Sequence, residues 1–281
     1  MSLPFTPTYA FPPGGMPDLS DDPAAAGAVF SDAYAFIPGS TMRDIVASLL
    51  PGWDKTRAWI IARPMTGFSE TFAQYAVEVA PGGGSTAPEP DAGAEAGIFI
   101  AAGHATLSID GSKHKHGAGT YFYVPPGSEW SIHNEDGTVL QFHWIRKRWQ
   151  PAEGLRKPDV IIARDDEAVL NYMPGTDKWA TQRFADPADL RHDMHINIVT
   201  FQPGGRIPFA ETHIMEHGLY VLQGTARYLL NTDWVEVAPG DFMWLRAFCP
   251  QACIATGDQP FRYLLYKDVN RHARLGGVLG S

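Results

Sequence analysis

Short runs of β-branched and aromatic residues recur along most of the chain, and each run is bounded by Gly, Pro, Asn or Asp. Runs of about four to six such residues are typical of short antiparallel strands. The pattern therefore predicts an all-β protein, either a sandwich or a barrel. The clearest runs are IFIAAG, TYFYVPPG, LQFHWI, LYVLQG, ARYLL, DFMWL and RYLLY. Helical periodicity is weak: residues 41–50 are the best helix candidate, and residues 165–175 offer one further turn.

The strand pattern occurs twice along the chain. Gly97-IFIAA-Gly103 matches Gly218-LYVLQ-Gly224, a displacement of 121 residues. Gly119-TYFYV matches Gly240-DFMWL and Phe142-HWIRK matches Tyr263-LLYKD at the same displacement. A repeat at one fixed displacement indicates two copies of one domain. We expect an N-terminal arm with first strands at 1–49, a first domain at 50–160 and a second at 161–281. Residues 151–159 (PAEGLRKPD) form the predicted connection.

Composition narrows the class of protein. Of the 281 residues, 44% are hydrophobic and 19% are charged, which supports a packed core. A net charge of -9 disfavours nucleic acid and anionic membrane surfaces as partners. The chain has neither an apolar run of roughly 20 residues nor a signal-peptide pattern at MSLPFTPTYAFPPGG. Two cysteines are too few for a secreted disulfide scaffold, so we expect a soluble, cytoplasmic protein.

The second copy contains a cluster of potential metal ligands in the segment ETHIMEHG (211–218). Glu211, His213 and His217 have the same parity, so on a strand their side chains point to one face, whereas Glu216 points away. Gln251 lies further along the chain and supplies a neutral carbonyl oxygen. Two nitrogen and two oxygen donors without a thiolate suit several divalent first-row metals and favour Mn²⁺.

Other interpretations of these residues stay open. Two histidines four apart also occur on metalloprotease helices, although the flanking PFA and GLYVLQG favour a strand. The pair could equally be structural histidines. Cys249 and Cys253 share the parity of Gln251, and either soft ligands or buried thiols would explain them.

The first copy lacks these ligands. Subtracting the repeat displacement places Pro90, Ala92, Ala96 and Trp130 at the four ligand positions, and none of them binds metal. The histidines of HKH (114–116) follow a turn-like DGSK and are expected to be exposed. The first domain is therefore predicted to be structural and metal-free, and the second to carry the site.

The motif G-x5-E-x-H-x3-H-x6-G, followed by PGD (239–241) and Gln251, resembles the double motif of cupins with its ligand types permuted. In HDMHINIVTFQPGG, ETHIMEHGLYVLQGTARYLLNTDWVEVAPGD and RYLLYKDVNR the chain resembles the bicupin (S)-ureidoglycine aminohydrolases of allantoin (purine) degradation, also called glyoxylate-induced proteins. The likeness extends over nearly the whole chain and implies two tandem jelly-roll β-barrels.

The resemblance also implies a site and an activity. Mn²⁺ would be held by Glu211, His213, His217 and Gln251, and the substrate would contact Tyr228, Tyr263 and Lys267. The implied reaction releases ammonia from ureidoglycine and forms (S)-ureidoglycolate. Our hypothesis is a metal-assisted hydrolytic deamination, with Glu211, Lys267 and Tyr263 as catalytic residues. Glu211 would transfer a proton and Lys267 would pair with the substrate carboxylate.

Alternative functions are another metal-dependent cupin enzyme, such as a dioxygenase or isomerase, a non-catalytic bicupin that binds a small ligand, and a structural bicupin of the seed-storage type. Lys267 could also be a solubilising lysine at a barrel mouth. The Pro-rich start makes a homo-oligomer plausible.

Overall fold

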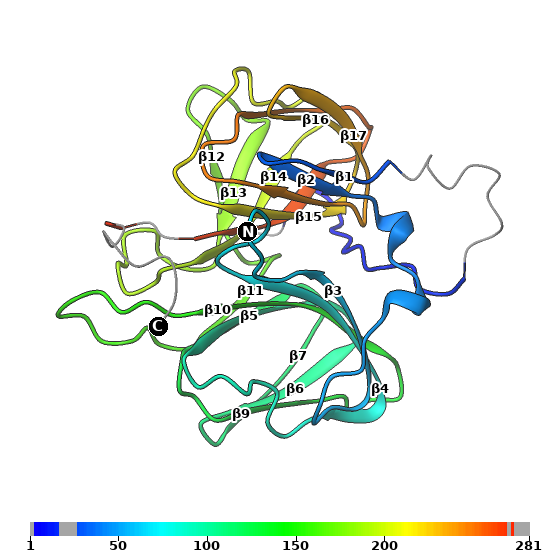
Figure 1. The fold of residues 1–281 in the computed structure, drawn as a ribbon, viewed down its shortest axis with the longest axis vertical. Coiled ribbons are helices and arrows are strands. Elements are labelled where there is room, and N and C mark those ends of the chain that lie inside the picture. Colours follow the sequence, from blue (N-terminus) through cyan, green and yellow to red (C-terminus); the bar gives the residue numbers. More distant parts are fainter. Residues whose placement is uncertain (1–2, 17–26, 269–270, 273–281) are drawn as a thin grey trace.

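The computed structural model describes residues 3–16, 27–268 and 271–272, and it consists of two lobes built almost wholly from β-strands (Figure 1). This architecture confirms the all-β, two-barrel fold predicted from the sequence. The lower lobe contains β3 (Asp54–Ala62), β4 (Ala73–Ser85), β5 (Ala94–Ala102), β6 (His104–Ile109), β7 (Ser112–Gly117), β8 (Thr120–Val124), β9 (Trp130–His133), β10 (Leu140–Arg148) and β11 (Ile161–Arg164). These strands form one sheet in the order β11-β8-β5-β10-β4-β9-β6-β7, with β3 added on β4.

The upper lobe has two sheets. Its strands are β1 (Val29–Phe30), β2 (Tyr34–Ile37), β12 (Leu170–Tyr172), β13 (Trp179–Arg183), β14 (His195–Phe201), β15 (His217–Gln223), β16 (Ala226–Leu230), β17 (Asp233–Val237), β18 (Phe242–Leu245), β19 (Gln251–Ala255) and β20 (Phe261–Lys267). The larger sheet runs β1-β2-β18-β15-β20-β14-β13-β12, and the smaller runs β17-β16-β19. Each of the seven apolar runs quoted above lies wholly or mostly on a strand.

The internal repeat is preserved in the strand pairing. Gly97 on β5 pairs with Ile145 on β10, and Gly218 on β15 pairs with Tyr266 on β20, at the predicted displacement of 121 residues. A register shift occurs at the same point of both pairs. Because a slip of one residue would turn every side chain to the opposite face, this agreement means that matching positions face the same way in both barrels.

In each lobe, one strand of the sheet comes from outside the residue range that the sequence predicted for that domain. The N-terminal β2 pairs with β18 of the second barrel, and β11 pairs with β8 of the first. The reason is edge pairing: β18 and β8 each have a free side in their own barrel, and an incoming strand satisfies the unpaired backbone groups there. The sheets therefore divide the chain differently from the ranges 1–49, 50–160 and 161–281.

The helix expected at 41–50 is not present. This region holds two short 3-10 turns, Gly39–Thr41 and Asp44–Val46, and Ser48 then forms a β-bridge with Ala58. Residues 165–175 do hold one turn, in which the backbone N–H of Ala168 donates to the carbonyl of Arg164, and the short strand β12 follows it. At 41–50, pairing with a neighbouring strand outweighs weak helical propensity. No helix of the described residues is long and apolar enough to cross a membrane.

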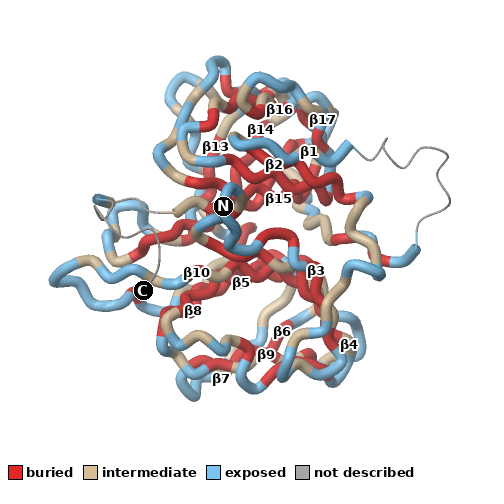
Figure 2. The backbone as a smooth tube through the Cα atoms, in the orientation of Figure 1, coloured by how far each residue is buried: buried red, intermediate tan, exposed pale blue. Residues whose placement is uncertain are grey.

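Three clusters of buried hydrophobic residues hold the molecule together, and the first lies at the junction of the lobes. Figure 2 shows buried backbone on both sides of this junction. There the rings of Phe72 and Tyr266 stack with centroids 3.9 Å apart. Phe72 also lies against Gly218, where a Cβ atom would approach its ring to 2.6 Å. The glycine that ends ETHIMEHG is therefore needed for the lobes to pack closely.

Candidate metal and active site

The floor of the candidate site is the inner face of four neighbouring strands, β15, β20, β14 and β13. Residues paired across antiparallel strands point to the same face, so the pairing defines rows of side chains. The rows are His217–Lys267–His195, then Leu219–Leu265–Asn197–Arg183, then Val221–Tyr263–Val199–Thr181. The sequence fixes which residues alternate, and the register decides which of them become neighbours.

A cavity of about 220 Å³ opens over these rows. Six of the seven predicted site residues line it, namely Glu211, His213, His217, Gln251, Tyr263 and Lys267. Ten further residues complete the lining: Met173, Trp179, Thr181, Arg183, Asn197, Val199, Ile207, Met215, Leu219 and Leu265. The seventh predicted residue, Tyr228, is fully buried behind Gln251.

The four proposed ligands come from a loop and two strands. Glu211 forms an isolated β-bridge with Gln251, and their backbones exchange two hydrogen bonds of 2.9 Å. Residues 212–216 are not strand, and β15 begins at His217. The expected alternation on one continuous strand is thus replaced by a bridge, a loop and a strand start, and helical placement of the histidines is excluded.

The side chains of these residues nevertheless approach one another. Glu211 Oε1 lies 3.2 Å from His213 Nε2 and 3.5 Å from Gln251 Nε2. The rings of His213 and His217 have centroids 5.0 Å apart. Burial, followed by the neighbouring His213 and Lys267, lowers the pKa of His217 to about 3. His217 is therefore a neutral imidazole at physiological pH, which is the form that binds metals.

The chemistry of this set fits a divalent cation. Two donors bound to one ion at about 2.1 Å and a right angle lie ~3 Å apart, close to the separation of Glu211 Oε1 and His213 Nε2. The site is only partly assembled, because nowhere in the described ranges do three His, Cys, Asp or Glu side chains already converge as a metal-binding group. The side chain of His213, 36% exposed, has the freedom to complete it.

Tyr228 orients Gln251. Its hydroxyl donates a hydrogen bond of 2.7 Å to Gln251 Oε1. Because a hydroxyl can both donate and accept, it can also hold the amide in the reversed orientation, with Oε1 towards Glu211 and Nε2 towards Tyr228. Tyr228 was expected to contact substrate, and in this structure its partner is a proposed ligand.

Glu216 lies on the other side of the ligand segment, as its parity predicted. Its carboxylate accepts hydrogen bonds from the backbone N–H groups of Glu70 (2.7 Å) and Thr71 (3.0 Å) of the first lobe. The indole of Trp244 donates a third, at 2.5 Å. The residue before His217 therefore fastens the ligand segment to the first barrel.

The cysteines are buried thiols packed in the core of the second barrel, and neither lines the cavity. In the first barrel, strand pairing places Ala96 at the position of His217 and Trp130 at that of Gln251. The HKH histidines lie on β7, outside the core, where both are partly exposed.

Sequence reasoning missed the polar residues that β13 and β14 contribute to the floor of the cavity, namely Arg183, Asn197 and Thr181. The alternation of Trp179, Thr181 and Arg183 along β13 was available as a signal. It carried no motif, however, and only the register of β13 on β14 brings these side chains to the cavity.

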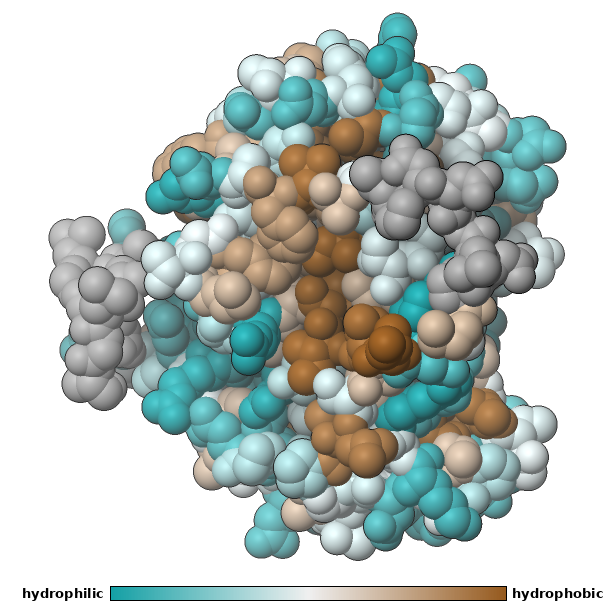
Figure 3. Space-filling model, turned by 45° about the vertical axis from the view of Figure 1, so that its right-hand side comes forward, coloured by the Kyte–Doolittle hydropathy of each residue, from teal (hydrophilic) through white to brown (hydrophobic). Residues whose placement is uncertain are grey.

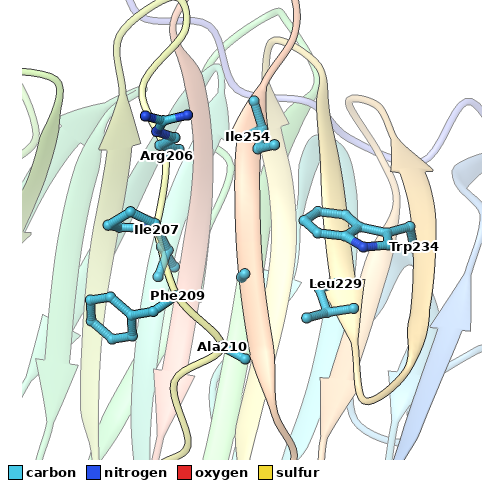
Figure 4. Close-up of a pocket in the computed structure, with 9 residues that line it drawn as sticks. Arg206, Ile207, Phe209, Ala210, Leu229, Trp234 and Ile254 are labelled. Atoms are coloured by element: carbon cyan, nitrogen blue, oxygen red, sulfur yellow. The ribbon is translucent and has the colours of Figure 1, made fainter.

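A second, larger cavity of about 390 Å³ lies on the outer side of β19 (Figure 4). Phe209, Leu229, Trp234 and Ile254 line it, and Arg206 is the one titratable residue of its lining. Without an acid, a base or a set of metal donors, this cavity offers no comparable chemistry. Ile254 and Gln251 thus face opposite sides of one strand, as alternation requires.

The structure and the site define a two-domain cupin, since a family described as Cupin domain matches residues 75–146 and 197–266. The chain is 30% identical to the (S)-ureidoglycine aminohydrolase of Escherichia coli K12, over 82% of this chain and 87% of that protein. It is 32% identical to the enzyme of the same name from Arabidopsis thaliana, over 90% of this chain and 82% of that protein. The chain belongs to the (S)-ureidoglycine aminohydrolase family.

A solved structure supports the same placement. A glyoxylate-induced protein from Pseudomonas aeruginosa is 54% identical and superposes with a TM-score of 0.90, covering 96% of this chain and 99% of that one. The resemblance inferred from sequence motifs is thereby confirmed.

Proposed function

We propose that this protein is a metal-dependent (S)-ureidoglycine aminohydrolase, which breaks the Cα–N bond of ureidoglycine with water and releases ammonia and (S)-ureidoglycolate. The observation that carries the proposal is the convergence of Glu211, His213, His217 and Gln251 with Tyr263 and Lys267 on one cavity. The proposed reaction belongs to purine degradation through allantoin, and we expect it in the cytoplasm.

Lys267, Tyr263 and Glu211 are proposed to have different roles in the reaction. Lys267 forms no ion pair with another described residue, so its ammonium is available to a substrate carboxylate. Tyr263 lies on the same face of β20, four residues before Lys267, and burial raises the pKa of its hydroxyl well above the ordinary value, which keeps it a neutral hydrogen-bond donor. Glu211 reaches the cavity with a carboxylate oxygen and is the candidate for carrying the proton from water to the departing amine.

Mn²⁺ is the proposed cofactor, with Glu211, His213, His217 and Gln251 as the residues that would hold it. A bound divalent ion supplies a Lewis acid and a template for orienting the substrate. The absence of any cysteine from the cavity lining and the mixed oxygen and nitrogen donors favour Mn²⁺ over softer metals.

Ammonia release from freshly prepared ureidoglycine tests the proposal. We expect wild type to exceed the spontaneous background, Glu211→Ala to lose about 10² to 10⁴-fold and Lys267→Met to lose activity mainly through KM. Matched controls are Glu236→Ala and Lys113→Met, which remove an exposed carboxylate and an exposed ammonium away from the cavity. Ammonia release no faster than the background would disprove the proposed activity.

The proposal includes a homo-oligomer. Figure 3 shows a band of hydrophobic residues that crosses the junction of the lobes on one face. Several large hydrophobic side chains of the N-terminal region are more than half exposed, among them Ile45, Val46 and Leu49. Light scattering on the purified protein measures its mass, and a monomer at all concentrations would refute this part.

A further inference from the structure

We infer that Arg183 is a second cation for the substrate carboxylate, beside Lys267, and that the amide of Asn197 recognises the adjoining ureido group. The site would thereby select N-carbamoyl α-amino acids, in which a carboxylate and a ureido N–H are carried on the same carbon. This inference rests on the proposed function for the identity of the substrate.

Strand register places these groups together. Arg183 on β13 pairs with Asn197 on β14, which pairs with Leu265 on β20. Lys267 is two residues beyond Leu265 and therefore points to the same face. All four line the cavity, so the two cations approach it from strands on either side of β14.

The charges of this wall are not balanced within the protein. None of the ion pairs formed between described residues involves Arg183 or Lys267. Burial first, and the charge of Arg183 second, lowers the pKa of Lys267, so the guanidinium is near enough to disfavour the charged form of the lysine. Like charges that share a site without a counter-ion are unfavourable, and an incoming carboxylate would relieve that repulsion. Arg183 is well suited to this role because a guanidinium can hold both carboxylate oxygens.

Asn197 provides an independent sign of a missing ligand group. Only 3% of the residue is exposed, and its Oδ1 has no hydrogen-bond partner. Buried amide groups are nearly always paired, so an unpaired one at a cavity wall is a natural acceptor for a ligand N–H. A ureido group offers such N–H groups next to the carboxylate.

In the first barrel the cation at the matching position is already paired with a carboxylate of the protein. Arg146 occupies the position of Lys267 there, and it forms an ion pair with Glu89 of the same lobe. Ile60 occupies the position of Arg183 and Tyr75 that of Asn197. A protein carboxylate thus neutralises the cation in the first barrel, whereas the second barrel has a second cation and an open amide.

Two stable probes test the inference without turnover. Ureidoacetate (N-carbamoylglycine) carries both the carboxylate and the ureido group, and ureidoacetamide lacks the charge. With the protein as purified and its metal content measured, calorimetry should show that Arg183→Gln binds ureidoacetate about 10 to 100-fold more weakly. Its affinity for ureidoacetamide should change by less than about 2-fold, and Arg183→Lys should recover part of the loss.

Asn197→Leu provides the second arm, because it keeps the side-chain size and removes the amide. It should weaken both probes, by about 5 to 50-fold. Arg227→Gln is the matched control, since Arg227 stacks on Trp234 away from the cavity and should bind both probes like wild type. Equal losses of both probes in Arg183→Gln, unchanged binding of ureidoacetate, or no binding of it by wild type would each overturn the inference.

Kinetics separates this inference from the proposed activity. If wild type releases ammonia from ureidoglycine, Arg183→Gln should raise KM more than it lowers kcat, and an unchanged KM would sink the inference alone. If wild type releases none but binds ureidoacetate through Arg183, the activity is wrong and the carboxylate site stands.

Discussion

The two barrels share a strand framework and differ in what fills it. Where the second barrel has His217 and Gln251, the first has Ala96 and Trp130, in matching register. Trp130 is 7% exposed and packs edge-on against Trp144. The first interior is therefore closed by aromatic packing where the second has polar groups around a cavity, which shows that the fold does not require the site.

The second barrel depends on segments outside its own range. The first lobe donates the backbone N–H groups that hold Glu216, the neighbour of His217. The N-terminal β2 completes the sheet of the second barrel. The first barrel thus helps to position the ligand segment of the second.

The largest effect is expected when a proposed metal ligand of the second barrel is replaced by the residue that the first barrel has at the matching position. We expect His217→Ala, which introduces the residue of the matching position, to reduce ammonia release by at least about 100-fold. The reason is the loss of a neutral imidazole from the proposed metal site. The measurements are the rate and the bound metal per chain, with circular dichroism to confirm folding. A folded variant with activity within a few-fold of wild type would contradict this role.

The position of Arg262 on β20 distinguishes the barrels next, because it holds one partner of a buried ion pair in the second barrel and a glutamine in the first. Arg262 and Asp165 are both fully buried and bonded at 2.7 Å, and Tyr9 and Gln182 also donate to Asp165. Removing one partner leaves a buried charge unpaired, so Asp165→Asn should lower the free energy of unfolding by about 3–5 kcal/mol. Urea denaturation measures the change.

The control for that experiment comes from the first barrel. Gln141 matches Arg262 and bonds to Glu78, a more exposed residue that also pairs with Arg57. Glu78→Gln should cost no more than about 1 kcal/mol. Similar losses in both variants would show that burial does not set the difference.

His143 of the first barrel is expected to make the stability of the protein depend on pH. It is fully buried where the second barrel has Leu264, and burial lowers its pKa to about 4. The imidazole takes up a proton near pH 6.5 in the unfolded chain but only near pH 4 in the folded protein. The folded protein is therefore most stable, as far as His143 is concerned, above pH 6.5. This contribution is lost as pH falls towards 4, and the change is roughly 3 kcal/mol.

His143→Leu should therefore flatten the acid side of the stability curve between pH 6.5 and 4. It also loses the 3.1 Å contact of His143 Nε2 with the Ala10 carbonyl. Denaturation midpoints measured across this range in both proteins give the difference, and parallel curves would rule out the titration of His143 as the cause.

The smallest effect is expected at the histidines of β7. A double variant, His114→Ala and His116→Ala, should change stability by less than about 0.5 kcal/mol, because both side chains lie outside the core. Bound metal and ammonia release should stay at wild-type values. A fall in metal content would show that the first barrel binds metal after all.

Much of this protein could be predicted locally. The apolar runs gave the strands, the displacement of 121 residues gave the two barrels, and the parity of the ligand segment separated Glu211 from Glu216. Helical propensity at 41–50 was too weak to resist pairing of Ser48 with Ala58. The pairing of β2 with the second barrel and of β11 with the first could not be predicted from the local sequence. It depends on which strand edges in the folded sheets are left without a partner.

By itself the sequence determined the short-range order: alternation, turns and the spacing of Glu211, His213 and His217, all set by residues close together in the chain. Only the tertiary structure decided which distant side chains meet. Strand register brought Arg183 and Asn197 to the face that carries Lys267, and packing put Tyr228 behind Gln251. The physical reason is that alternation fixes the face of a strand, whereas its neighbours are fixed by pairing across the sheet.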